Sequence, residues 1–356
     1  MEKSKLISEL DSSILYVKDK RVKRIYGIDL LKIFAMINII NLHINRNSKL
    51  LKINPDNSKF KQIYRLEVFS FWPVNAFGLI SGIIGFRKYK FSNLIYFYFE
   101  NIFYSIFFSI CLYLKSLLDL KNFILSFFPL GIKRFWYFNA YFFMFLILPF
   151  ITSSINSINR NFYRKLIICY FFLYSIYHIV LDIVLGRTDF DFINGGYTSI
   201  WLLTLYIIGG YIGRFCIKRY NLSNYFFFGI YLISSFISSE YIFYCYKKNK
   251  PLNLLFLRYY SPTIIIQAIS LIFFFSNIDI SNKFIIKVIS FFNPLNFNVA
   301  LIHMRIFLFR TQSITKYFDY IKLLAPDYRF IAIKYQLNKI NSKIFLEINS
   351  FSYFIF

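Results

Sequence analysis

Long runs of apolar residues, separated by short polar segments, cover most of the chain. A helix needs roughly 20 mostly apolar residues to cross the ~30 Å hydrocarbon core of a bilayer. Nine runs come close to that length, which predicts an all-α, polytopic membrane protein with about nine membrane-spanning helices. The predicted spans are 25–45, 67–86, 91–114, 135–155, 166–185, 197–216, 225–246, 254–276 and 284–308.

Two parts of the chain do not fit this pattern of spans. The apolar stretch 122–131 is too short to cross a bilayer and contains Pro129, so we expect a re-entrant or interfacial segment. After residue 310 no run reaches span length. We therefore divide the chain into an N-terminal cytoplasmic segment (1–24), a transmembrane domain (25–310) and an atypical basic tail (311–356).

The composition supports a membrane protein and excludes two other classes. Hydrophobic residues make up 57% of the chain and charged residues 17%, against ~45–50% and ~25% in soluble domains. A soluble domain has too little interior to bury so many apolar side chains, and a disordered chain has few of them. The bilayer is therefore the first expected partner.

The charge is strongly positive, with 42 basic against 17 acidic residues and a net charge of +25. Nucleic acid is not expected as a partner, because the basic residues punctuate the apolar runs and form no single patch. The connections after the second, fourth and sixth spans are basic, which favours a cytoplasmic N-terminus. The 46–66 connection on the other side is also basic, which weakens this argument for the orientation. A/T-rich codons would by themselves explain part of the lysine excess.

The first span contains three ionisable groups, Asp29, Lys32 and His43. Such groups are costly in lipid, so they usually face protein or a water-filled cavity. Lys32 and His43 are eleven positions apart, which puts them within about 20° of one helix face and about 16 Å apart along the axis. Asp29 and Lys32 can neutralise each other at the i,i+3 spacing.

A histidine in this place suits proton transfer, because an imidazole with its usual pKa of ~6.5 accepts a proton from a hydroxyl near neutral pH. The alternative is that Lys32 snorkels to one surface and His43 lies at the other interface. Spacing alone leaves both interpretations open.

Glycines recur at a four-residue spacing in two predicted spans. Gly78 and Gly82 lie in the second span, and Gly209 and Gly213 lie in the sixth. This spacing puts small residues on one helix face and lets two backbones approach closely. We therefore interpret both pairs as helix-packing sites.

Other polar groups within the spans are candidates because burying them is costly. Glu100 lies in the middle of the third span and needs a partner or a cavity. His303 lies in the ninth predicted span. His178 and Asp182 are four positions apart in the fifth, and we interpret them as a structural pair.

The order of these motifs resembles the integral-membrane acyltransferases called acyltransferase family three. The first span of that family carries Arg or Lys, ten residues and then His, which Lys32 and His43 match after a Gly-Ile-Asp-Leu-Leu run at 27–31. A second-span pattern and the start of a later span are also similar. The residues that match these two patterns are Asn75, Phe77, Ile80, Ser81, Gly82, Trp136, Tyr137, Ala140, Tyr141 and Pro149. The resemblance covers about 24–310.

The resemblance implies an O-acyltransferase that moves an acyl group, most simply acetyl, from acyl-CoA to a sugar hydroxyl. The acceptor is a bacterial surface polysaccharide or its lipid-linked precursor, and the location is the cytoplasmic membrane. His43 is the implied general base or acyl relay, and Lys32 stabilises anions or fixes the first helix. Acetyl-CoA or another acyl-CoA is a substrate, and no resident cofactor or metal is expected. Donor or acceptor contacts are expected at Asp29, Asn75, Ser81, Glu100, Tyr137, Tyr141 and His303.

The family has ten spans with both ends in the cytoplasm, one span more than this chain shows. We therefore expect the tail, 311–356, to be truncated or frame-shifted, with loss of activity if the last span is missing. The main alternative function is a transporter or flippase of lipid-linked sugars, which would move substrate without acyl transfer. A membrane interaction or polymerase-like protein would be favoured by a large external loop, which the sequence lacks.

Overall fold

A computed structural model describes residues 24–48, 50–52, 56–85, 91–114, 120–130, 136–185, 193–217, 222–248, 254–296 and 299. Over these residues the regular secondary structure is helical, with no strand among them. Eight helical segments in this part of the chain are long and apolar enough to cross a bilayer. The protein is therefore an all-α, multi-pass membrane protein, as the apolar pattern predicts.

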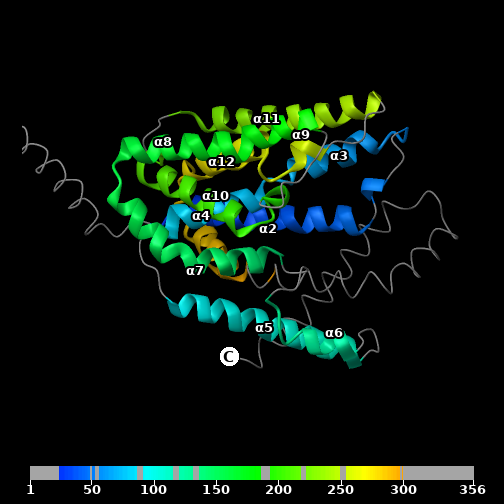
Figure 1. The fold of residues 1–356 in the computed structure, drawn as a ribbon, viewed down its shortest axis with the longest axis vertical. Coiled ribbons are helices and arrows are strands. Elements are labelled where there is room, and N and C mark those ends of the chain that lie inside the picture. The colour runs from blue at the N-terminus through cyan, green and yellow to red at the C-terminus, as the bar shows by residue number, and fades with distance from the viewer. Residues whose placement is uncertain are drawn as a thin grey trace, which may run out of the picture. The chain divides into compact units, whose positions relative to one another are not determined.

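The helices can be followed along the chain in Figure 1. They are α2 (Tyr26–Asn47), α3 (Phe60–Phe69), α4 (Pro73–Gly85), α5 (Phe91–Leu114), α6 (Leu120–Leu125), α7 (Trp136–Ser157), α8 (Arg160–Phe171), α9 (Tyr177–Leu185), α10 (Ser199–Tyr211), α11 (Asn224–Lys247) and α12 (Pro262–Ser276). Residues 283–296 are helical as well. The π-helical turns η3 (Phe172–Ile176) and η5 (Ile212–Cys216) join α8 to α9 and extend α10, and short 3₁₀ turns are η1 (Leu50–Lys52), η4 (Asn194–Gly196) and η6 (Leu254–Leu257).

Eight of the nine predicted spans correspond to these membrane-length segments. Two of them begin earlier than predicted: the second at Phe60 and the fifth at Arg160. The fifth starts there because the Asn159 side chain caps it by accepting a hydrogen bond from the Phe162 N–H. The ninth predicted span, 284–308, is described as a helix only at its start, and residues 1–23 and the basic tail lie outside the described residues.

The chain divides into two compact units. The first comprises Met1–Phe103 and Phe128–Leu301, and the second comprises Tyr104–Phe127 and Ile302–Phe356. In the described part of the second unit, the Ser105 hydroxyl donates to the Ser126 carbonyl oxygen at 2.7 Å, which ties α5 to the turn after α6. All residues of the candidate site belong to the first unit.

Helices α4 and α10 lie at the centre of the first unit (Figure 1) and pack backbone against backbone. A Cβ atom added at Gly82 would lie 2.0 Å from the Tyr206 carbonyl oxygen, and one at Gly209 would lie 2.0 Å from the Leu79 carbonyl oxygen. Only glycine permits this separation. The prediction that these glycines are packing sites is confirmed.

The second membrane segment is broken between α3 and α4. Side chains from two other helices and from Trp72 in the break bond to backbone and hydroxyl groups there, as the absence of water in a bilayer core requires. The Phe69 carbonyl oxygen accepts from the Tyr231 hydroxyl at 2.8 Å and from the Trp72 indole N–H at 3.0 Å. The Asn41 amide of α2 donates to the Ser70 hydroxyl at 2.8 Å. These contacts fix the break at a defined position beside α2.

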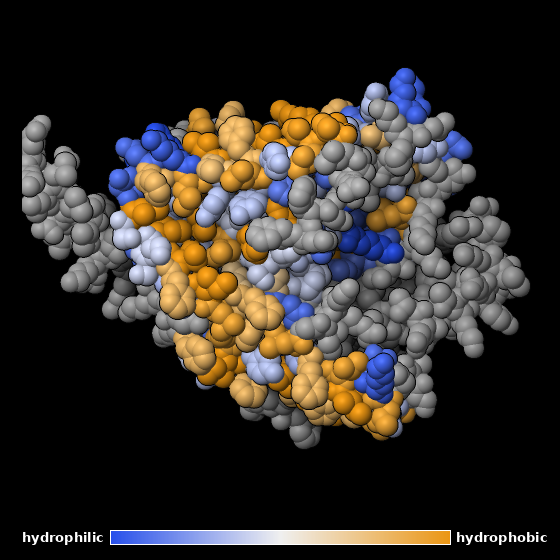
Figure 2. Space-filling view, in the orientation of Figure 1, coloured by the Kyte–Doolittle hydropathy of each residue, from blue (hydrophilic) through white to orange (hydrophobic). Residues whose placement is uncertain are grey.

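The described surface is apolar along the flanks of the helices (Figure 2), while polar residues gather at the start of α8 and the end of α11. On α9, Ile183 and Val184 are 60% and 71% exposed, and Tyr225 of α11 is 87% exposed. Apolar side chains in such numbers would be unfavourable in water. Lipid is the solvent that this surface fits.

Candidate functional site

Arg24, just before α2, and Asp29 and Lys32 in its first turns form a charged triad. Asp29 accepts from the Arg24 Nε at 2.6 Å and from the Lys32 Nζ at 3.0 Å, and its side chain is only 8% exposed. The predicted pairing of Asp29 with Lys32 is confirmed. Because one carboxylate serves two cations, the triad keeps a net positive charge.

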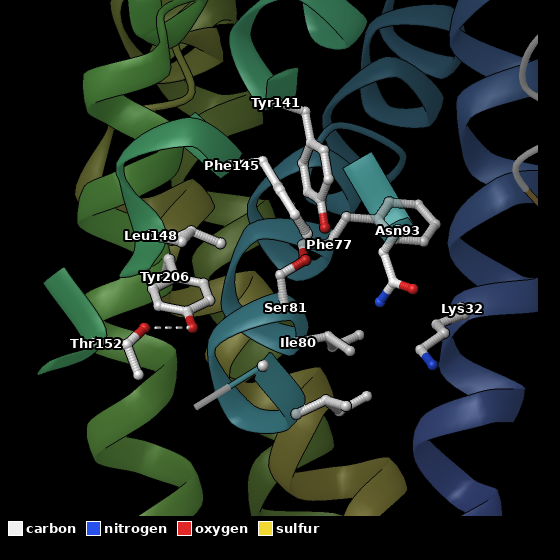
Figure 3. Close-up of a pocket in the computed structure, with 12 residues that line it drawn as sticks. Lys32, Phe77, Ile80, Ser81, Asn93, Tyr141, Phe145, Leu148, Thr152 and Tyr206 are labelled. Atoms are coloured by element: carbon white, nitrogen blue, oxygen red, sulfur yellow. Dashed lines mark hydrogen bonds between the residues drawn. The ribbon is translucent and has the colours of Figure 1, made fainter. Parts of the chain in front are cut away.

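Lys32 reaches a cavity of about 330 Å³ between α2, α4, α5, α7 and α10 (Figure 3). That volume is at the lower end of the ~300–1,000 Å³ of ligand sites. The cavity is lined by Lys32, Phe77, Ile80, Ser81, Ile84, Gly85, Asn93, Tyr141, Phe145, Leu148, Thr152 and Tyr206. Three of the predicted site residues, Lys32, Ser81 and Tyr141, therefore share one cavity.

The polar groups of the cavity are few and spaced around apolar walls. In Figure 3 the Tyr141 hydroxyl points toward Ser81, and Thr152 and Tyr206 lie across the cavity from Lys32. The Ser81 hydroxyl donates to the Phe77 carbonyl oxygen of its own helix at 2.8 Å, so its lone pairs remain available as acceptors. The Thr152 and Tyr206 hydroxyls are 3.3 Å apart. The cavity thus offers one cation and several hydroxyls to a largely apolar ligand.

His43 lies on the same uninterrupted helix, eleven residues beyond Lys32. Helical geometry puts the two side chains on one face, about 16 Å apart along the axis. His43 is half-buried and already interacts with a neighbouring group. His43 does not line the cavity, so Lys32 and His43 lie at different depths of the helix bundle.

The end of α2 contains an ion pair that the sequence interpretation missed. Glu67 of α3 is 1% exposed; it accepts from the Asn45 amide at 3.1 Å and from the Arg46 Nε at 3.3 Å. Arg46 falls one helical turn beyond His43. A usable signal existed: Phe60, Tyr64 and Glu67 repeat at helical spacing, which puts the carboxylate on the buried face of α3.

Asn75 is fully buried and joins three parts of the fold. Its amide nitrogen donates to the Tyr259 carbonyl oxygen at 2.7 Å, and its amide oxygen accepts from the Trp201 indole N–H at 3.1 Å. These partners are backbone and side chain of the protein itself. The contacts support a structural role for Asn75 rather than the predicted contact with a substrate.

Replacing Asn75 by alanine is expected to destabilise the protein by about 2–3 kcal/mol, because it leaves a buried N–H and a buried carbonyl unpaired. Thermal unfolding in detergent measures the change. Asn38→Ala is the matched control, since the Asn38 amide donates only to the Phe34 carbonyl of its own helix at an exposed position. Equal stability of the two variants would contradict the structural role.

Two more of the predicted residues, Tyr137 and Glu100, are described and do not line the cavity. Tyr137 of α7 stacks on Tyr141, with the ring centroids 6.0 Å apart. Glu100 of α5 is half-buried, with no ion-pair partner among the described residues. His303 lies outside the described residues.

The His178 and Asp182 pair also fits a structural role. Asp182 is buried and accepts from the Tyr260 hydroxyl at 2.6 Å. A His178 ring nitrogen lies 2.9 Å from the Leu173 carbonyl oxygen. The Asp182 bond ties α9 to Tyr260 just before α12, and the His178 contact lies between α9 and the π-helical turn η3.

Within the described residues, no group of three or more His, Cys, Asp or Glu side chains is placed to hold a metal ion. Comparisons with protein-family models, with curated proteins and with solved structures found no match.

Proposed function

We propose that the protein is a membrane O-acyltransferase that moves an acyl group from acyl-CoA to a sugar hydroxyl of an envelope glycan or its lipid-linked precursor. Helix α2 carries this proposal. It presents Lys32 to a cavity beside Ser81 and Tyr141, and it presents His43 on the same face about three turns further on. A cation and a proton acceptor at two depths fit a two-substrate reaction across a membrane.

The cavity supports a donor that enters from the cytoplasm. It lies where α2 and α5 begin and where α4 ends, with the middle of α7 and Tyr206 of α10 along its wall. The residues that follow α4, α7 and α10 in the chain include many basic ones, which favours the cytoplasmic side. They include Arg87, Lys88, Lys90, Arg160, Arg164, Lys165, Arg214, Lys218 and Arg219. Acyl-CoA, an anionic cytoplasmic molecule, would meet this positive end first.

In the proposed reaction His43 takes the proton from the acceptor hydroxyl. The hydroxyl oxygen attacks the carbonyl carbon of the thioester, a C–O bond forms and the C–S bond breaks. The sulfur leaves as CoA thiolate and receives the proton from His43. Lys32 holds an anionic part of the donor, and its pairing with Asp29 keeps the ammonium group aimed at the cavity.

The proposal is tested by comparing membranes from cells with and without the gene. Membranes that contain the protein are expected to transfer label from acetyl-CoA to envelope glycans, and mass spectrometry is expected to show acyl groups on those glycans. Glycans that are identical in the two strains, together with no label transfer, would rule out the proposed activity.

Replacing Lys32 by glutamine is expected to raise the KM for acyl-CoA about tenfold or more, because a charge-assisted contact is worth about 1.5–3 kcal/mol. Lys61→Gln is the matched control. Lys61 is an exposed cation of α3 that lies 5.8 Å from the Phe243 ring and does not line the cavity. If the KM for acyl-CoA is the same in both variants, Lys32 does not hold the donor.

Transport of a lipid-linked sugar is the second candidate, and the break between α3 and α4 favours it. Interrupted membrane helices surround the substrate sites of many transporters. Here, however, side chains of α2 and α11, and the Trp72 side chain of the break itself, bond to residues of the break. Flux of a labelled glycolipid in proteoliposomes, without acyl transfer, would favour transport over the enzyme.

A further inference from the structure

The ion pair at the end of α2 is built to hold Arg46 in one place. Glu67 is buried and fixed by Asn45, and the Arg46 guanidinium lies 5.5 Å from the centre of the Phe71 ring. The Arg46 side chain is nevertheless 41% exposed. A buried carboxylate in a membrane protein is costly and marks a functional site by default. The Nε of Arg46 is therefore held by Glu67, while part of the side chain remains exposed to a ligand.

Aromatic rings surround this arginine. The Phe71 ring stacks on Tyr259 at 4.8 Å, and Tyr259 contacts Trp136 at 5.7 Å and Tyr197 at 4.9 Å. Tyr197 and Tyr259 lie within electrostatic range of the guanidinium. Phe71 and Tyr259 are fully buried, whereas Trp136 and Tyr197 are half-exposed. The buried rings support the two rings that a ligand can reach.

This arrangement matches what a sugar needs from a protein. The C–H faces of a sugar ring pack on aromatic rings, and its hydroxyls accept hydrogen bonds from a guanidinium. We propose that Arg46, Trp136 and Tyr197 bind the acceptor sugar, and that the sugar residue they bind is uncharged. The assignment rests on the proposed acyltransferase function and adds a site for its second substrate.

The preference for an uncharged sugar follows from the ion pair. Glu67 lies 3.3 Å from the Arg46 Nε, so the pair is neutral as a unit and offers hydrogen-bond donors without a net charge. A neutral hydroxyl loses little hydration free energy when it moves from water into such a site. A carboxylate would lose far more hydration free energy, and the site offers no net positive charge in return.

The position of Arg46 fits the proposed reaction. Residues three apart on a helix are neighbours, with Cβ atoms about 5–6 Å apart, so Arg46 and His43 lie at a similar depth along α2. The donor cavity lies at the other end of that helix, at Lys32. A sugar on Trp136 and Tyr197 would approach His43 from the side opposite to the donor.

Tryptophan fluorescence tests binding independently of activity. Of the three tryptophans, Trp72 and Trp201 are buried at 0% and 1% exposure, so only Trp136 is accessible to a ligand. The full-length protein in detergent is titrated with methyl glycosides of glucose, galactose, mannose, rhamnose and N-acetylglucosamine, and with methyl glucuronide. We expect a saturable change in tryptophan fluorescence with at least one neutral glycoside. With the glucuronide we expect a weaker fluorescence change or none.

Two variants and a control decide the assignment. Arg46→Gln should abolish the change or raise the apparent Kd by about tenfold or more. Trp136→Phe should remove the fluorescence change, which identifies Trp136 as the reporter. Arg65→Gln should leave it intact, because the Arg65 and Glu240 pair joins α3 to α11 at 46% and 44% exposure, away from the rings around Arg46. No saturable change with any glycoside, or equal binding by Arg46→Gln, overturns the proposal.

Kinetics separate this proposal from the proposed function. If the wild-type protein transfers acyl groups, Arg46→Gln should raise the KM for the acceptor at least about tenfold and leave the KM for acyl-CoA unchanged. Arg46→Lys should restore part of the loss. An active wild type whose Arg46→Gln variant has an unchanged acceptor KM overturns the acceptor site alone. A wild type without acyl transfer overturns the proposed function, and the acceptor site with it.

Discussion

Alanine in place of His43 is expected to lower the rate of acyl transfer by about 10²–10⁴-fold, the usual contribution of a positioned general base. Besides His43, the ionisable groups on this side of α2 are Asp29, Lys32 and Arg46, and the Asp29 carboxylate is already paired with Arg24 and Lys32. The measurement is label transfer from acetyl-CoA to glycan, normalised to the amount of folded protein in the membrane.

His178→Ala is the matched control for this prediction. His178 is also a half-buried histidine on a membrane helix, but its ring nitrogen contacts a backbone carbonyl oxygen of its own segment. The control should keep its activity, and both variants should insert and unfold like the wild type. Activity retained by His43→Ala, or lost equally in both variants, would contradict the role of His43.

Gly82→Ala is expected to destabilise the fold by about 3 kcal/mol or more, at the upper end of overpacking effects. The new methyl group would lie 2.0 Å from the Tyr206 carbonyl oxygen and 2.8 Å from the Gly210 nitrogen, both backbone atoms that cannot rotate away. Helices α4 and α10 would have to separate, and Tyr206 would leave the cavity wall. Thermal unfolding and size-exclusion chromatography in detergent should show the loss of folded protein.

The control for Gly82 is Gly229→Ala in α11. No atom outside its own helix lies within 4 Å of a Cβ added at Gly229, and alanine is the better helix former by about 1 kcal/mol. This variant should be as stable as the wild type or slightly more stable. A Gly82→Ala protein that is no less stable than Gly229→Ala would show that α4 and α10 are not in backbone contact.

The apolar pattern was sufficient to predict most of the fold. Span length decided the positions of α2, α5, α7, α10, α11 and α12, because lipid requires a continuous apolar helix. The four-residue glycine spacing predicted that both α4 and α10 pack closely, and the structure shows that they pack against each other. The sequence did not reveal the break between α3 and α4, whose residues are bonded by Asn41, Trp72 and Tyr231.

The positions of site residues could be predicted from the sequence where they lie on one helix. They could not be predicted where several helices bring the residues together. The shared face of Lys32 and His43 follows from the geometry of α2 alone. Thr152 and Tyr206 are unremarkable in sequence, and only the packing of α7 on α10 brings them to the cavity. The Arg46 and Glu67 pair joins the end of α2 to α3; the spacing of Glu67 puts it on the buried face of α3, but nothing in the sequence pairs it with Arg46.

The contacts of Asn75 also constrain how the protein is assembled in the membrane. Its two partners, Trp201 and Tyr259, are 126 and 184 positions further along the chain. During synthesis α4 therefore enters the membrane long before either partner exists, with its glycine face and its buried amide still uncovered. This glycine-rich helix with one buried amide has to wait in lipid or beside a chaperone until α10 arrives. The centre of the bundle is thus completed late, and a nascent chain that stops before Tyr259 lacks one of the two partners of Asn75.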